Sequence, residues 1–222
     1  MNLPLNQVIH GDCLEVMKTF PDKSIDLVLT DIPYGVSKEH GGLREIDYGE
    51  WDKNISPEIV ASWVGEMARV SKGSVYIFCA DRQFSNIFNQ LESLGFIVRK
   101  YEWLKTNPNV MNGQHFWLRS GELCVCAKRP QSYYNGNCEK AYRIMGSPTD
   151  RIHPTQKPVE IMQEMITRSS EEGGVVLDPF GGSCTTAVAC KMLKRNYICI
   201  EKEEKYVNIC NARIAATTSP MF

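Results

Sequence analysis

Two groups of residues have the types and spacing to do chemistry, and each follows an apolar run. The first is Asp31-Ile32-Pro33-Tyr34, directly after SIDLVLT. Pro33 restrains Ile32 to an extended backbone and offers no amide donor. The turn can therefore present two acceptors, a carboxylate and a carbonyl, to an amine that donates two hydrogens, and a ring to a flat base. This is a candidate catalytic corner, and an ordinary strand-to-loop turn is the alternative when the segment is considered alone.

The second group lies in VVLDPFGGSCTT, near the C-terminus. Asp178 ends an apolar run, and Gly181 and Gly182 allow the backbone to approach a ligand closely. The helix that begins at 183–186 offers unpaired N–H groups to an anion. Glu201 ends the next apolar run, about twenty residues on, where an acid can accept hydrogen bonds from both ribose hydroxyls. The unit predicts a nucleoside-cofactor site, although turn glycines alone are weak evidence.

Both groups need a sheet whose strand ends lie at one edge. Apolar, β-branched runs alternate with amphipathic segments along most of the chain, which predicts an α/β fold with an open, mostly parallel sheet and helices on both faces. Ligands bind beyond the carboxyl ends of strands in such sheets. Segments 96–105 and 121–129 have no helix between them and predict an antiparallel pair at one edge. Residues 131–154 are rich in turns and lack periodicity.

Composition is compatible with one domain spanning residues 1–222. The chain is 43% hydrophobic and 23% charged, as in soluble globular proteins. No apolar run of about 18 residues could span a membrane. Because no basic-then-apolar signal segment precedes the first polar residues, the expected location is cytoplasmic.

The nine cysteines show no C-x-x-C pair and no histidine at zinc-finger spacing. We therefore expect no metal site and reduced cysteines that behave as small hydrophobic side chains. Charge is distributed unevenly: residues 1–60 carry 5 Lys/Arg against 11 Asp/Glu, and residues 99–157 carry 10 against 4. The basic segment could supply a phosphate-facing surface, or its charges could lie on unrelated faces.

Taken in order, these motifs resemble the β class of D-P-P-Y amino-methyltransferases, which act on adenine N6 or cytosine N4 of DNA. DIPYG resembles the D-P-P-Y signature, and DPFGGSCTT resembles the cofactor loop D-P-F-x-G-S-G-T-T. In the β class the signature precedes the loop, as it does here. HGDCLEVM, YEWLKTNPNV, GELCVCAKR, HPTQKPVEIMQEMI and NYICIEKEEKYVNICNARI resemble further segments of that family.

The resemblance implies a Rossmann-like S-adenosylmethionine-dependent methyltransferase fold, with double-stranded DNA as partner. It implies site-specific methylation of the exocyclic amine of a flipped base, with adenine N6 favoured by the acid at the first signature position. A cytosine-N4 enzyme and a catalytically impaired DNA- or cofactor-binding module are the alternatives. A homodimer and a partner restriction endonuclease are compatible with it.

For individual residues, the resemblance implies that Asp31 and the Ile32 carbonyl hold the target amine, Pro33 shapes the turn and Tyr34 stacks on the base. Lys157 would lie near the cofactor's carboxylate or be a solvated lysine, and His153 is expected to be a turn residue. The implied cofactor-binding residues are Asp12, Lys157, Asp178, Phe180, Gly182, Ser183, Thr185 and Glu201.

Two departures from the family pattern matter. Ile32 replaces a proline, but a backbone carbonyl is what the corner requires. Cys184 replaces a glycine and would be strained if the position needs a positive φ; as a nucleophile it has no role, because amine methylation forms no enzyme–base adduct. The loop 35–54 and the segment 106–150 are candidate DNA-contacting insertions, with the basic stretch 99–157 the better source of backbone contacts.

Overall fold

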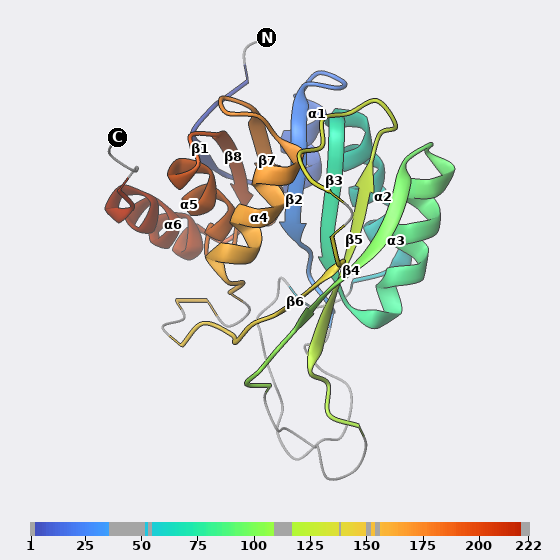
Figure 1. The fold of residues 1–222 in the computed structure, drawn as a ribbon. Coiled ribbons are helices and arrows are strands. Elements are labelled where there is room, and N and C mark those ends of the chain that lie inside the picture. Colours follow the sequence, from blue (N-terminus) through green and yellow to red (C-terminus); the bar gives the residue numbers. More distant parts are fainter. Residues whose placement is uncertain are drawn as a thin grey trace.

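An eight-stranded sheet runs through the centre of the protein, in the strand order β1-β8-β7-β2-β3-β5-β4-β6 (Figure 1). The computed structural model describes residues 3–35, 52, 55–108, 117–137, 139–149, 152–153 and 156–218. The strands are β1 (Gln7–His10), β2 (Ile25–Asp31), β3 (Ser71–Cys79), β4 (Ile97–Leu104), β5 (Gly121–Lys128), β6 (Tyr142–Ile144), β7 (Val175–Asp178) and β8 (Asn196–Glu201). The helices are α1 (Cys13–Lys18), α2 (Pro57–Val70), α3 (Asp81–Ser93), α4 (Val159–Ser169), α5 (Thr185–Met192) and α6 (Glu204–Ala216).

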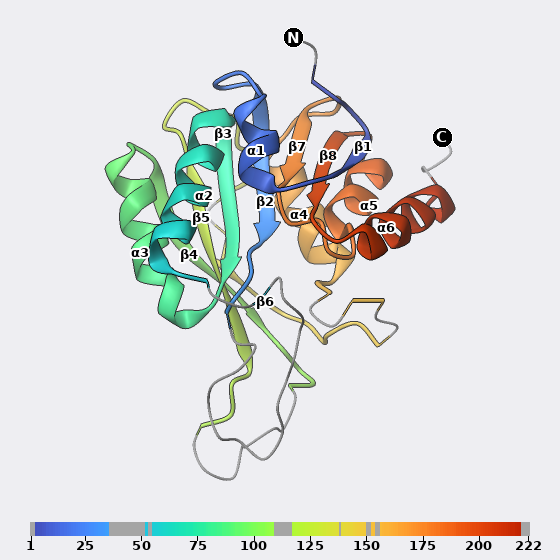
Figure 2. The same cartoon turned by 180° about the vertical axis from the view of Figure 1, so that it is seen from behind.

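The helices cover both faces of the sheet, as the sequence predicted. Helices α4, α5 and α6 lie on the face seen in Figure 1, and α1, α2 and α3 lie on the face seen in Figure 2. Each layer buries its own apolar cluster: Trp63 and Met67 of α2 pack on one face, and Ile161 and Met165 of α4 pack on the other. No helix among the described residues is long and apolar enough to cross a membrane.

Within the described strands, β5 alone runs against the others. It pairs antiparallel with β3 on one side and with β4 on the other, whereas the remaining ladders are parallel. The antiparallel pairing of 96–105 with 121–129 is therefore confirmed. The prediction that this pair forms the edge was wrong, because β6 pairs with the outer side of β4.

Strand β6 arises in a segment that the sequence left without structure. It is three residues long and alternation cannot be read over so short a run. Trp103 fixes the segment from β4, since its indole N–H donates to the carbonyl of Met145 at 2.8 Å. This tertiary contact, rather than local propensity, places β6 at the edge.

The chain changes direction across the sheet between β2 and β7. From β2 the next strand, β3, is added on one side, and from β7 the next strand, β8, is added on the other. Loops from neighbouring strands therefore leave in opposite directions and open a crevice at the carboxyl ends of β2 and β7. The catalytic corner follows β2, and the cofactor loop follows β7.

Candidate active site

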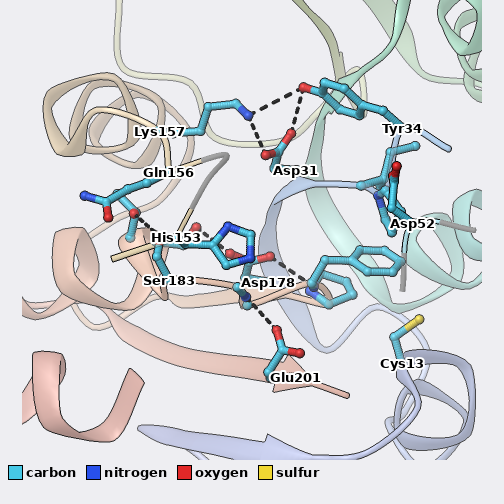
Figure 3. Close-up of a pocket in the computed structure, with 18 of the residues that line it drawn as sticks. Cys13, Asp31, Tyr34, Asp52, His153, Gln156, Lys157, Asp178, Ser183 and Glu201 are labelled. Atoms are coloured by element: carbon cyan, nitrogen blue, oxygen red, sulfur yellow. Dashed lines mark hydrogen bonds and ion pairs between the residues drawn. The ribbon is translucent and has the colours of Figure 1, made fainter. Parts of the chain in front are cut away.

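A cavity of about 420 Å³ lies at this crevice and brings the two predicted groups together (Figure 3). Its volume is in the range of small-molecule sites. Every predicted site residue lines it: Asp12, Asp31, Ile32, Pro33, Tyr34, Lys157, Asp178, Phe180, Gly182, Ser183, Thr185 and Glu201.

The corner after β2 is held by the start of α3. The amide of Gln83 donates to the carbonyl of Pro33 at 2.9 Å, while its oxygen accepts the N–H of Ala80 at 2.9 Å. The N–H of Ile32 donates to Phe78 of β3 at 3.2 Å and its side chain is buried. Within the described chain the Ile32 carbonyl accepts no hydrogen bond. The side chain at position 32 packs in the core, so isoleucine in place of proline leaves this carbonyl available.

The Asp31 carboxylate is engaged on both oxygens. The Tyr34 hydroxyl lies 2.8 Å from Oδ1, and the Lys157 ammonium pairs with Oδ2 (Figure 3). Glu122 lies 2.9 Å from the same ammonium and also pairs with Lys105. Two acids and two lysines, with one phenol, thus form a largely buried cluster at the corner.

This cluster fixes the charge states of its members. Burial raises the pKa of Asp31, and the Lys157 ammonium opposes that rise. Burial works against the Lys157 ammonium, yet Asp31 and Glu122 together raise its pKa above the ordinary value. Burial also works against ionised Glu122, but Lys157 and Lys105 lower its pKa to about 2. Lys157 is therefore a charged donor at neutral pH.

The cofactor loop is organised by Asp178. Thr30 and Thr186 each donate a hydroxyl to its carboxylate at 2.7 Å, and the N–H of Phe180 donates at 3.2 Å. Burial raises the pKa of Asp178 to about 7, against the lowering effect of these hydrogen bonds. With both oxygens engaged, Asp178 is placed to shape the loop rather than to reach far into the cavity.

Glu201 closes the other side of the loop. One oxygen accepts the N–H of Gly182 at 2.7 Å and the other accepts the N–H of Glu203 at 2.8 Å. Gly182 has a φ of 52°, which a side chain would strain. A carboxylate oxygen has more than one lone pair, so Glu201 can still accept from hydroxyl groups in the cavity. Phe180 adds an apolar wall and packs edge-on against Trp63, with ring centroids 4.8 Å apart.

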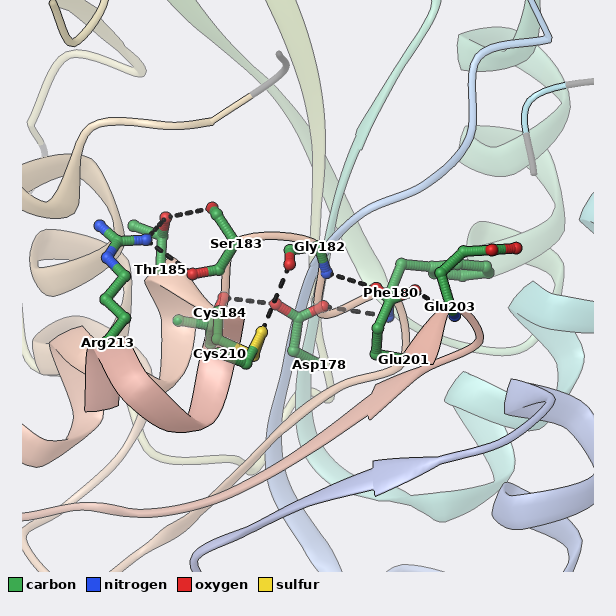
Figure 4. Close-up of a disulfide and its surroundings, with 11 residues drawn as sticks. Asp178, Phe180, Gly182, Ser183, Cys184, Thr185, Glu201, Glu203, Cys210 and Arg213 are labelled. Atoms are coloured by element: carbon green, nitrogen blue, oxygen red, sulfur yellow. Dashed lines mark hydrogen bonds between the residues drawn. A yellow bond between two sulfur atoms is a disulfide. The ribbon is translucent and has the colours of Figure 1, made fainter. Parts of the chain in front are cut away.

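Helix α6 holds the end of the loop (Figure 4). The guanidinium of Arg213 donates to the Ser183 carbonyl at 2.7 Å and to the Thr185 hydroxyl at 3.0 Å. The Ser183 and Thr185 hydroxyls lie 3.0 Å apart. Both predicted cofactor residues are therefore fixed from outside the loop.

Cys184 has the positive φ that its position suggested, 52°. Its side chain forms a disulfide with Cys210 of α6 (Figure 4). The expectation that all cysteines are reduced was wrong for this pair, because 26 residues separate them and only the packing of α6 against α5 brings their Cα atoms to 5.3 Å. The free cysteines of the described chain are Cys13, Cys79, Cys124, Cys126, Cys190 and Cys199.

Asp12 and His153 also line the cavity. The carboxylate of Asp12 accepts the N–H of Leu14 at 2.9 Å and so caps α1. His153 is more than a turn residue: it is buried and its ring packs edge-on against Tyr206, with centroids 4.5 Å apart. Burial, aided by the Lys157 charge, lowers the pKa of His153 to about 4, so the ring is neutral at pH 7.

Sequence reasoning missed Glu122, Gln83 and Arg213. Glu122 could have been found, because an antiparallel strand begins where its parallel neighbours end. The pairing of Cys79 with Leu123 puts the start of β5 at the carboxyl edge of β3. No comparable signal marks Gln83 or Arg213, which act by packing across the fold.

The candidate DNA-contacting segments are only partly described. Of the loop 35–54, Gly35 and Asp52 are described, and the Gly35 N–H donates to the Asp52 carboxylate at 2.7 Å; residues 36–51 and 53–54 lie outside the described residues. In segment 106–150, Trp117 is 88% exposed and Arg119 lines the cavity. The positions 109–116, 138 and 150 lie outside the described residues.

The donor set fits S-adenosylmethionine. Glu201 offers carboxylate lone pairs to ribose hydroxyls, Phe180 offers an apolar face, and the positive φ of Gly182 keeps a side chain out of the loop. This cavity, at the switch point of a mostly parallel sheet and opposite an acid–carbonyl corner, has the place and the lining of a nucleoside-cofactor site in an α/β enzyme.

The chain belongs to the DNA methylase family, whose sequence model (N6_N4_Mtase) matches residues 25–212. It is 32% identical over 247 residues to the type II methyltransferase M.HinfI of Haemophilus influenzae, covering 95% of this chain and 68% of that protein. It is 30% identical over 239 residues to M2.DpnII of Streptococcus pneumoniae, covering 94% and 89%.

Solved structures agree with the fold. The complex of M1.HpyAVI with S-adenosylmethionine superposes with a TM-score of 0.73 at 28% identity, covering 94% of this chain and 98% of that one. The cytosine-N4-specific PvuII DNA methyltransferase superposes with a TM-score of 0.72 at 19% identity, covering 93% of this chain and 85% of that one, and shares the fold. The protein is a DNA methyltransferase with S-adenosylmethionine as its cofactor.

Proposed function

We propose that this methyltransferase modifies the exocyclic amine of a base flipped out of double-stranded DNA, at adenine N6. The observation that carries the proposal is the position of Asp31 and the Ile32 carbonyl, which open into the same cavity as the loop 178–186. Two acceptors at the end of one rigid strand suit an amine with two hydrogens.

The residues of the corner would act by orientation and electrostatics. When bound, S-adenosylmethionine supplies an electrophilic methyl group. Asp31 and the Ile32 carbonyl accept the two N–H groups, which discourages delocalisation of the nitrogen lone pair into the base and points it at the methyl group. Tyr34 offers its ring as a stacking face for the flipped base. Stacking offsets the cost of base flipping, which is about a few kcal/mol.

The proposal is tested by replacing Asp31. Asp31→Ala should lower methyl transfer by about 10²–10³-fold or more, because the corner loses its charged acceptor. S-adenosylmethionine binding, measured by calorimetry, should be retained because Asp31 is not in the cofactor loop. Asp22→Ala is the matched control: it removes the same charge from a side chain that is 72% exposed and outside the cavity. Turnover by Asp31→Ala at the wild-type rate would refute the assignment.

Adenine N6 is distinguished from cytosine N4 by base-resolved sequencing of DNA methylated by the wild-type protein. The acid at position 31 favours adenine by resemblance to the family, and the geometry alone suits either amine. Tritium transfer from the labelled methyl donor tests the alternative of another class. A chain that binds both DNA and cofactor and transfers no methyl group would be a catalytically impaired module.

We further propose that residues 1–222 form one domain that acts in the cytoplasm and contacts DNA around the cavity through the segments 35–54 and 106–150. Support comes from Arg119, which lines the cavity, and from Trp117, two residues earlier in the chain, whose side chain is 88% exposed. A homodimer and a restriction endonuclease partner stay predictions from sequence. Sedimentation of the purified protein and sequencing of methylated cellular DNA would test them.

A further inference from the structure

Lys157 occupies one oxygen of the Asp31 carboxylate, the group proposed above to accept a hydrogen bond from the substrate amine. The ammonium donates to Oδ2 of Asp31, and the Tyr34 hydroxyl occupies Oδ1. If an amine is the methyl acceptor, as proposed, one of its N–H groups must be accepted by this carboxylate. Each oxygen keeps a further lone pair, but an amine that takes the acceptor position now held by the ammonium displaces Lys157 from Oδ2.

Glu122 is placed to receive the released ammonium. Its Oε2 lies 2.9 Å from Nζ of Lys157 and 3.2 Å from Oη of Tyr34, while its Oε1 pairs with Lys105. The Lys157 side chain is only 3% exposed. A buried ammonium needs a counter-ion, because burial removes most of its hydration. Glu122 can supply that charge once Asp31 accepts a hydrogen bond from the amine of the base.

We propose that Glu122 is a positioning residue that holds the Lys157 ammonium while the target amine replaces it on Asp31. The proposal rests on the amine methylation proposed above. Before substrate enters, Lys157 pairs with Asp31; afterwards it stays charged on Glu122. This differs from the role that the resemblance gave Lys157, which was to lie near the cofactor's carboxylate.

The two variants should shift the ionisation of Asp31 in opposite directions. Lys157 stabilises the carboxylate, so its removal raises the pKa of Asp31; Glu122 repels it, so its removal lowers that pKa. The titratable and charged groups around Asp31 come from six elements: Tyr34 after β2, Cys79 of β3, Lys105 after β4, Glu122 and Cys124 of β5, Asp178 of β7 and Lys157 before α4.

The test compares wild type, Glu122→Gln, Lys157→Gln and the double variant in single-turnover methyl transfer to duplex DNA. Glu122→Gln should transfer the methyl group about 30-fold more slowly than wild type. Without the Glu122 charge, the Lys157 ammonium remains paired with Asp31. The double variant should be about threefold or more faster than Glu122→Gln alone, since the Lys157 ammonium no longer competes with the amine for Asp31. Calorimetry with S-adenosylmethionine should give the same affinity for Glu122→Gln as for wild type.

The pH profile of kcat/KM separates positioning from mere structure. Its acidic limb reports the free enzyme; it should move to higher pH in Lys157→Gln and to lower pH in Glu122→Gln. Glu122→Asp keeps the charge, and its rate should lie between those of wild type and Glu122→Gln. It also provides a folded variant if glutamine at this position prevents folding.

Three results would overturn the inference: a Glu122→Gln variant as fast as wild type, strictly multiplicative effects in the double variant, or acidic limbs that do not shift in opposite directions. These outcomes leave amine methylation by the wild-type protein intact. If the wild-type protein modifies no base amine, the proposed function fails first, and the inference fails with it.

Discussion

His153 shows how burial sets the charge of a single residue in the cofactor cavity. The imidazole is 7% exposed and lies near the positive charges of Lys157 and Lys205. Both burial and these charges disfavour the imidazolium. A neutral ring suits a wall of a nucleoside site, whereas a charged one would repel a cationic sulfonium.

This buried histidine predicts a loss of stability in mild acid. Its pKa falls from 6.5 to about 4 on folding, so the unfolded chain binds more protons between these values and stability is lost as pH falls from 6.5 to 4. At pH 5 this amounts to about 2 kcal/mol relative to pH 7. Urea unfolding at both pH values should show the loss in wild type and a smaller loss in His153→Gln. His10→Gln, at an exposed histidine, should behave as wild type.

Helix α6 anchors the cofactor loop through two of its side chains. Arg213 bonds to the backbone and to a side chain of the loop, and Cys210 joins it covalently at Cys184. Cys184 occupies a left-handed conformation that costs a non-glycine residue about 1–2 kcal/mol. The disulfide keeps this residue in place, so the loop depends on a helix that follows it in sequence.

We therefore expect the stability to depend on the redox state. A disulfide that spans 26 residues stabilises by about 3 kcal/mol in the chain-entropy account. Adding dithiothreitol should lower the free energy of unfolding of the wild-type protein, measured in urea, by about that amount. Cys210→Ser cannot form the bond, so reductant should leave its unfolding unchanged. Equal sensitivity of the two proteins would assign the effect to another site.

At the scale of the whole molecule, the basic residues of 99–157 that the structure describes do not form one face. Lys105 and Lys157 point into the cluster at the corner. Arg129 donates to the carbonyl of Ser71, at the opposite end of the sheet from the cavity, and Arg143 pairs with Glu164 of α4. Net charge along a segment is thus a poor guide to a DNA surface, because neighbouring strand residues point to different faces and ends.

Arg119 is the cation best placed to meet a phosphate. It lines the cavity, is 50% exposed, and its pair with Asp81, at 3.3 Å, is of the surface kind that contributes little. Arg119→Gln should weaken DNA binding and reduce the slope of log affinity against log salt by about 1. Lys128→Gln, at the far end of β5, is the matched control and should leave the slope unchanged. A slope unaltered in both variants would exclude a phosphate contact by Arg119.

The sequence by itself determined the class of protein and the two ends of its site. Asp31-Ile32-Pro33-Tyr34 and the loop from Asp178 both follow apolar strands. The carboxyl ends of parallel strands lie at the same edge of the sheet, where such folds bind their ligands. The alternation of helices and strands followed from local periodicity. These features are local, so neighbouring residues were enough to predict them.

Tertiary structure decided which groups meet across long separations. Lys157 reaches Asp31 over 126 residues, Glu122 joins them because β5 is reversed, and β6 forms only because β4 offers an open edge. The bond between Cys184 and Cys210 likewise depends on where α6 packs. Such contacts depend on the energy of packing and of buried charge in the assembled fold, which no local pattern encodes.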